Sequence, residues 1–471
     1  MYRFLKKDYL IILFFLIIYL SILDNQLIII NNNFLNKIGL NNISIKWVSF
    51  FLTIIFGLYI ILKKKDKYFF TNQRYIILFF IYIFLFSLIN FIQKPIEILN
   101  NFEKIKIIFN LNKNLSIYLF IFSKLVYWIS LILIFFILYT VLAKYPKNKI
   151  ENYLIFFFCI FILLNLLYEI IVQSDILSIK KTLLTYNKDP NYNKFIGKTL
   201  IIKNNTYVFE NISHHRFIGT FREPSYLGFY CSLIFFVNFS KQINIRFIFI
   251  LRFISALLLF ATVSVKIIFF SLFMIVYLLF ILEEKKKIII YYFLPLIAAL
   301  IFDIFFFDHI KYLFFKLIYY LMAFFPDLLN FINKLNFGKP LIIILENTDI
   351  IDKAATSTIY KQEITKYISM INLLFGLSYF PKYIEQFYIL FLGKGALIDT
   401  FYVSGIFILL LVYQFYKNVL IVDKVNIYKN LILLFYMLYY FYFVKDTFQI
   451  DLVLIYIIMY VNSKNKFKYF K

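Results

Sequence analysis

The side chains best suited to chemistry gather in one short stretch, HHRFIGTFREPSYLG at residues 214–228. Two of the six arginines of the chain, Arg216 and Arg222, lie in it, although lysine supplies most of the 50 basic residues. A guanidinium group is planar and donates paired hydrogen bonds to phosphate or carboxylate. Arginines kept in such a lysine-rich chain therefore predict an anion-binding site. The alternative is a surface Arg–Glu pair without function.

The same stretch contains groups that could accept a proton. Glu223 is the first candidate for a general base, and His214 or His215 is the second. Pro224 suits the first turn of a helix, so Glu223 and Ser225 would lie at a helix N-terminus, where anions bind. Alternatively, Glu223 only caps that helix and the histidines are solvated. The adjacent histidines lack metal-ligand spacing, so the sequence predicts no metal and no other cofactor.

Glycine is also scarce, and its positions are informative for the same reason. The chain has ten glycines, and several of them lie in or beside two long loops. Two glycine-containing elements stand out. The first is RFIGTFREPSYLG at 216–228. The second is LLFG at 373–376, followed by LGKGALIDTFYVSGIFILLL at 392–411. The candidates for a structural role are Gly219, Gly376, Gly393, Gly395 and Gly405.

The elements that must position these residues follow from the composition. Of 471 residues, 63% are hydrophobic and 16% are charged, and the mean hydropathy is +0.82. Soluble domains have roughly 45–50% apolar and about 25% charged residues, so a soluble enzyme is excluded. The formal net charge of +25 comes from lysines at the ends of apolar runs, which indicates contact with lipid headgroups and no nucleic acid.

Spanning helices require about 20 mostly apolar residues. Twelve runs fit, at 8–24, 45–62, 75–92, 119–143, 152–172, 224–240, 247–264, 266–282, 288–307, 400–416, 428–444 and 450–462. The predicted fold is thus an all-α polytopic membrane protein with about 12 transmembrane helices, forming a single integral membrane domain over 1–471.

Lysine clusters predict the orientation of these helices. The clusters at 63–67, 144–149, 285–287 and 464–471 fall on one side together with both termini, and this side is cytoplasmic by the positive-inside rule. Two long loops, 173–223 and 308–399, then face outward. The larger one should contain amphipathic helices, one of them at 357–375 and an interfacial segment at 310–325.

These two elements resemble a known family. RFIGTFREPS is similar to the R-x-x-G-x-F-x-E-P-S element of O-antigen polymerases (Wzy-type), which form a broader group with the O-antigen ligases. The second element resembles the family's G-x-G, then Asp399 and Tyr402, then a Gly-Ile pair that enters a helix. Where the family often has arginine, this chain has Lys266, after Ser264 and Val265, and Lys361.

The resemblance implies a metal-independent glycosyltransferase. Such enzymes transfer a growing glycan from one undecaprenyl-pyrophosphate carrier onto an incoming lipid-linked repeat unit, at the outer face of the bacterial inner membrane. The implied pyrophosphate and substrate contacts are Arg216, Arg222, Lys266, Lys361, Asp399 and Tyr402. A separate chain-length regulator would be a partner.

Two other functions fit the same sequence. An O-antigen ligase would transfer the glycan from the same donor to lipid A-core. A flippase or transporter of lipid-linked oligosaccharides would place charged residues at mid-membrane, for which Lys124, Glu169 and Arg252 are the candidates.

Overall fold

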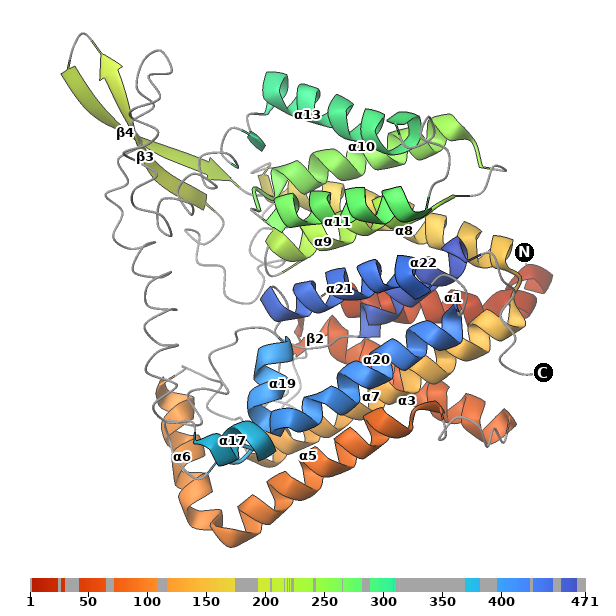
Figure 1. Ribbon diagram of the computed structural model, residues 1–471, viewed down its shortest axis with the longest axis vertical. Coiled ribbons are helices and arrows are strands. Elements are labelled where there is room, and N and C mark those ends of the chain that lie inside the picture. The colour runs from red at the N-terminus through yellow and green to blue at the C-terminus, as the bar shows by residue number, and fades with distance from the viewer. Residues whose placement is uncertain are drawn as a thin grey trace.

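The long apolar runs fold into helices in the computed structural model. The structure describes residues 2–23, 27–29, 42–64, 72–108, 117–173, 194–203, 206–215, 217, 219, 221, 224–239, 243–264, 266–281, 289–307, 309–310, 313, 369–381, 396–423, 427–443 and 450–463. Each of the twelve apolar runs predicted from the sequence falls on a helical segment of this described part. Figure 1 shows most of these helices running side by side in one bundle.

The N-terminal half of the bundle contains α1 (Tyr2–Ile22), α3 (Ile45–Lys64), α5 (Arg74–Gln93), α6 (Pro95–Ile108), α7 (Ile117–Lys144) and α8 (Lys147–Gln173). The middle contains α9 (Pro224–Leu233) with the 3-10 turn η2 (Ile234–Phe236), α10 (Ile245–Ala261), α11 (Lys266–Ile281), the π-helical turn η3 (Ile289–Phe293) and α13 (Leu294–Phe306). The C-terminal part contains α17 (Met370–Phe375), α19 (Ala396–Ser404), η4 (Gly405–Phe407), α20 (Ile408–Val422), α21 (Ile427–Phe443), η5 (Ile450–Leu452) and α22 (Val453–Asn462).

Four helical stretches of the described part are long and apolar enough to cross a membrane, at Arg74–Gln93, Ile117–Lys144, Lys147–Ile170 and Ala396–Val422. They support the coarse prediction of a helical membrane protein. The sequence also predicted that the run from 247 to 282 divides into two helices, and this is confirmed. Helix α10 ends at Ala261, α11 begins at Lys266, and Val263 between them has a positive φ of 46°.

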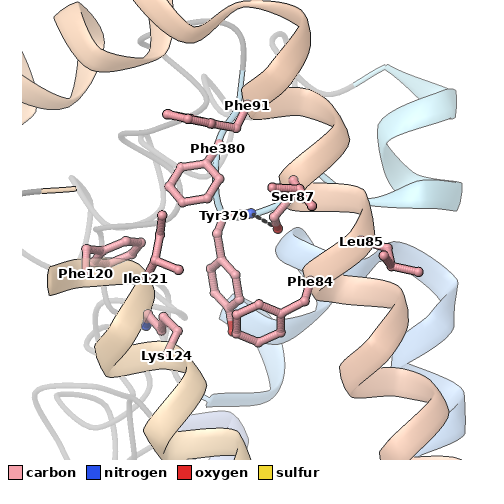
Figure 2. Close-up of a pocket in the computed structure, with 10 residues that line it drawn as sticks. Phe84, Leu85, Ser87, Phe91, Phe120, Ile121, Lys124, Tyr379 and Phe380 are labelled. Atoms are coloured by element: carbon pink, nitrogen blue, oxygen red, sulfur yellow. Dashed lines mark hydrogen bonds between the residues drawn. The ribbon is translucent and has the colours of Figure 1, made fainter. Parts of the chain in front are cut away.

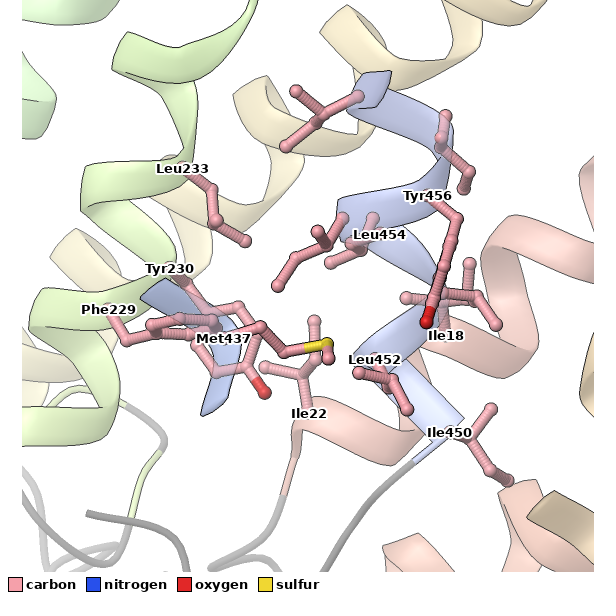
Figure 3. Close-up of a cluster of buried hydrophobic side chains, with 14 of the residues drawn as sticks. Ile18, Ile22, Phe229, Tyr230, Leu233, Met437, Ile450, Leu452, Leu454 and Tyr456 are labelled. Atoms are coloured by element: carbon pink, nitrogen blue, oxygen red, sulfur yellow. The ribbon is translucent and has the colours of Figure 1, made fainter. Parts of the chain in front are cut away.

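Helix α7 lies inside the bundle, because its residues from Leu131 to Leu142 are all buried. The same buried core joins helices that are far apart in the sequence. Figure 3 shows Ile18 of α1, Phe229 of α9, Met437 of α21 and Leu454 of α22 packed together. Shared apolar burial of this kind fixes the helices relative to one another.

The starts of α1 and α8 and the end of α22 meet at one end of the bundle. Lys149 forms a hydrogen-bonded ion pair with the buried Asp8, and the Lys147 ammonium donates to the Ser463 carbonyl oxygen. The opposite ends of these helices point toward α6, α17 and α19 (Figure 1). We call this opposite end, where α7 begins and α5 ends, the loop end.

Two β-hairpins add strands that the all-α prediction did not include. Strand β1 (Leu27–Ile29) pairs with β2 (Asn42–Ser44), and β3 (Lys194–Lys203) pairs with β4 (Thr206–His215), both antiparallel. The longer hairpin lies within the predicted loop 173–223 and extends away from the helices (Figure 1). Its strands are rich in aromatic and β-branched residues, which favour pleated structure over a structureless loop.

Most of the predicted loop 308–399 lies outside the described residues. This applies to the interfacial segment 310–325, apart from Ile310 and Leu313, and to 357–368 of the predicted amphipathic helix. The last turns of that helix are present as α17, whose six residues have no buried member.

Candidate functional site

The first element, 216–228, packs against α8 through Gly219. Its backbone N–H donates to the buried Glu169 carboxylate at 2.6 Å. Gly219 has a φ of +57°, and a Cβ atom built there would lie 2.9 Å from the Asn165 Cγ atom. Asn165 is itself held by a hydrogen bond from Nδ2 to the Phe161 carbonyl oxygen. The close approach of this turn to α8 therefore requires glycine.

Two phenylalanines hold the rest of this element between the helices. Phe221 is buried and stacks on Tyr230 of α9, with ring centroids 5.1 Å apart, and it also meets Phe161 of α8 at 6.0 Å. The Phe217 N–H donates to the carbonyl oxygen of Ala261, the last residue of α10, at 2.9 Å. The element is thus pinned to α8, α9 and α10 at the loop end.

A buried histidine–aspartate pair lies beside Phe217. The His309 Nδ1 atom is 2.6 Å from Asp303 Oδ1, and the other carboxylate oxygen accepts from the Ile310 N–H at 2.7 Å. The side chains are 7% and 0% exposed, respectively. The Phe217 and His309 rings are edge to face with centroids 5.6 Å apart. A carboxylate that accepts from Nδ1–H orients the imidazole and leaves Nε2 as the acceptor, which is how a histidine base is prepared.

The second element folds back on itself at two glycines. The Leu377 N–H donates to the Tyr402 carbonyl oxygen at 2.6 Å, and the Ser378 N–H donates to that of Val403 at 3.0 Å. Gly376 has a φ of +85° and Gly405 a φ of +58°. Cβ atoms at either position would collide with backbone, because one built on Gly405 would lie 2.6 Å from the Gly376 nitrogen. The end of α17 and the junction of α19 with η4 are therefore in direct backbone contact.

The segment after Gly376 is fastened to α5 and α7. The Trp128 Nε1–H donates to the Tyr379 hydroxyl at 2.8 Å, and the Tyr379 N–H donates to Ser87 Oγ at 3.1 Å. Asn90 Nδ2 donates to Ser378 Oγ at 2.9 Å. All residues from Gly376 to Pro381 are buried. The backbone of this segment is thereby fixed on the loop end of the bundle.

The two elements flank the same helix, α21. From the first element, Tyr226 meets the Tyr440 ring with centroids 6.2 Å apart, and Phe229, the residue that follows the element in α9, stacks on the same ring at 3.6 Å. From the second element, α19 contacts α21. Asp399 and Tyr402, the predicted substrate contacts, lie on α19 and are half-buried.

The other predicted site residues either lie outside the described part of the chain or belong to β4, α9 and α11. Arg216, Arg222, Glu223, Lys361, Gly393 and Gly395 lie outside the described residues. His214 and His215 end strand β4, opposite Phe195 and Lys194, respectively, in the register of the hairpin. Pro224 is the first residue of α9, as predicted, and the half-buried Ser225 follows it. Lys266 is the first residue of α11.

Arg252, one of the charged residues considered for a transporter, is buried and contacts neighbouring segments of the bundle. Its guanidinium donates to the carbonyl oxygens of Val237 and Tyr291, both at 2.7 Å, and lies 3.9 Å from the centroid of the Tyr292 ring. This arginine ties three segments of the bundle together. Glu169 holds the Gly219 turn, as described above.

The Asp303–His309 pair was not predicted from the sequence. The two residues are six positions apart, across the end of α13 at Phe306. No local motif marks such a pair, and the only signal was that His309 is one of three histidines in the chain.

No family model, curated protein or solved structure matches this chain.

Proposed function

We propose that this chain is a membrane glycosyltransferase that polymerises undecaprenyl-pyrophosphate-linked repeat units into a surface polysaccharide. The observation that carries the proposal is the arrangement of the two elements that resemble O-antigen polymerases. One meets α21 through Tyr226 and the other through α19, at the same end of the bundle. Elements more than 140 positions apart in the sequence thus contact the same helix, which supports a substrate shared between them.

The proposed topology has twelve spans, with both termini in the cytoplasm of a bacterium and the loop end at the outer face of its inner membrane. Its support is that the twelve apolar runs coincide with helices and that the described lysine cluster at 144–149 lies at the other end. Several of these helices are shorter than 18 residues, and 3-10 or π-helical turns extend some of them.

In the proposed reaction the pyrophosphate is the leaving group. Negative charge grows on it as the glycosidic bond breaks, and fixed cations at that point stabilise the transition state. Arg216 and Arg222 are proposed for this role, with Lys266 and Lys361 as further contacts. Asp399 and Tyr402 would contact the glycan from α19.

The acceptor hydroxyl requires a base, and the geometry favours His309. Asp303 holds its Nδ1 atom at 2.6 Å, and its ring meets Phe217, the residue that follows Arg216. His309 thus contacts the residue next in the chain to the proposed pyrophosphate contact. It is a further candidate base in addition to Glu223, His214 and His215 from the sequence, and separate mutation of each residue distinguishes them.

The test is the length distribution of surface glycan in a strain that carries Arg216→Ala as its only copy of the gene. The proposal expects single-repeat glycolipid at the surface and no long chains. Long polymer that accumulates on the carrier without transfer to core would favour the ligase. Repeat units that never reach the outer face would favour the flippase. Normal ladders would refute a role for this arginine. A chain-length regulator, the proposed partner, would shift the modal length of the ladder and leave polymerisation itself intact.

A further inference from the structure

A cavity of about 170 Å³ lies at the loop end between α5, α7 and the segment after Gly376. Figure 2 shows its lining, which includes Phe84, Phe91, Phe120, Tyr379, Phe380 and Lys124. Apolar cavities of about 150 Å³ take up a molecule as large as benzene. This cavity therefore has room for roughly one isoprene unit of a lipid chain.

Lys124 carries the only charge among the described residues that line the cavity. It lies two turns into α7, and its ammonium nitrogen is 5.2 Å from the centroid of the Phe120 ring and 5.4 Å from that of Tyr379. Aromatic faces attract a cation at these distances and hold it on the cavity wall. Burial raises the pKa of Tyr379, so that ring remains neutral and does not compete as an anion.

The cavity is preformed and opens to the outside of the bundle. Its Tyr379 wall is fixed by the hydrogen bonds to Trp128 and Ser87. Leu85 and Leu88 also line it, and they are 55% and 53% exposed. In a membrane, such exposed leucines on α5 face lipid. A chain can thus enter sideways from the bilayer.

We propose that this cavity holds the phosphate-proximal end of a polyprenyl phosphate or pyrophosphate, with its first isoprene unit among the aromatic rings and its phosphate on Lys124. A single cation beside room for a single chain fits a one-chained phosphate lipid better than a two-chained phospholipid. The identity of this lipid rests on the proposed function. None of the described residues that line it belongs to the first element, and Tyr379 and Phe380 in its wall follow Gly376 of the second element.

The experiment measures binding of a labelled polyprenyl monophosphate to the purified full-length protein in detergent. Lys124→Met should raise the Kd at least tenfold, because it removes the charge-assisted hydrogen bond to the phosphate. Lys124→Arg should retain binding. Lys144→Met, at the other end of the same helix, is the matched control and should bind as the wild type does.

A second pair of variants tests the cavity itself. Leu88→Trp should fill it and block binding, whereas Leu78→Trp, on an equally exposed residue of α5, should not. Neutral polyprenol should bind weakly and equally to the wild type and Lys124→Met. The proposal is overturned if Lys124→Met leaves the Kd unchanged, or if phosphatidylglycerol displaces the probe at equal concentration.

The two proposals can fail separately. If Arg216→Ala abolishes long glycan but Lys124→Met does not change the Kd, the polymerase proposal is supported and this lipid site is refuted. If Lys124→Met raises the Kd but Arg216→Ala and Arg222→Ala produce normal glycan ladders, the lipid site is supported and the proposed reaction is refuted.

Discussion

Replacing Gly376 by alanine should release the segment after α17 from the loop end of the bundle. Gly376 has φ +85° and ψ 179°, a conformation that is essentially confined to glycine. A Cβ atom there would lie 2.6 Å from the Ser404 nitrogen and closer still to the Val403 carbonyl oxygen. These atoms are backbone and cannot turn aside as a flexible side chain can. Alanine therefore forces the two parts of the second element apart.

The cost follows from what this separation breaks. The backbone conformation costs alanine about 1–3 kcal/mol. The bonds from the Leu377 and Ser378 amides to Tyr402 and Val403 are lost, and each contributes about 1 kcal/mol. The sum is about 3–5 kcal/mol. Since about 1.4 kcal/mol is tenfold in an equilibrium constant, the open form should become roughly 10² to 4 × 10³ times more populated.

Hydrogen exchange read by mass spectrometry measures this opening in the purified protein. Peptides that cover 376–381 should lose protection by roughly that factor, while peptides from the interior of α7 keep theirs. Gly228→Ala is the control, because a Cβ atom there would lie 3.4 Å from both Leu259 and Thr262, an ordinary contact. Wild-type protection of 376–381 in Gly376→Ala would refute the close approach on which this reasoning depends.

Three further predictions concern the first element and its neighbours. Arg222→Lys should lose most polymerisation because lysine cannot make the paired hydrogen bonds of a guanidinium, and full glycan ladders would contradict this. His309→Gln should slow glycan transfer in an in vitro assay by about 10²–10⁴-fold, the usual effect of losing a general base, and Asp303→Asn should slow it less. An unchanged midpoint of thermal unfolding in both variants would show that the loss of rate is not due to misfolding. Gly219→Ala should lower the midpoint of thermal unfolding by pushing on Asn165, and adding Asn165→Ala should recover part of the loss; no recovery would mean that the two residues do not touch.

Much of the helical architecture could be predicted because hydropathy acts along one helix at a time. The apolar run at 119–143 is long enough to form a helix wherever it packs, and α7 spans Ile117–Lys144. The break near Ser264 was visible as an interruption of an overlong run. The β3–β4 hairpin was not predicted because its apolar residues do not alternate strictly with polar ones, so the period of two is a weak signal.

The sequence alone predicted the class of the molecule, the places of its long apolar helices and the two glycine-containing elements. It did so because composition and local periodicity depend only on neighbouring residues. Only the tertiary structure decided what those elements touch. The Asp303–His309 pair, the contact of Gly376 with Gly405 and the aromatic setting of Lys124 depend on how helix ends meet. Trp128 and Tyr379, which fix one wall of the proposed lipid site, are 251 residues apart, and such contacts arise from packing alone.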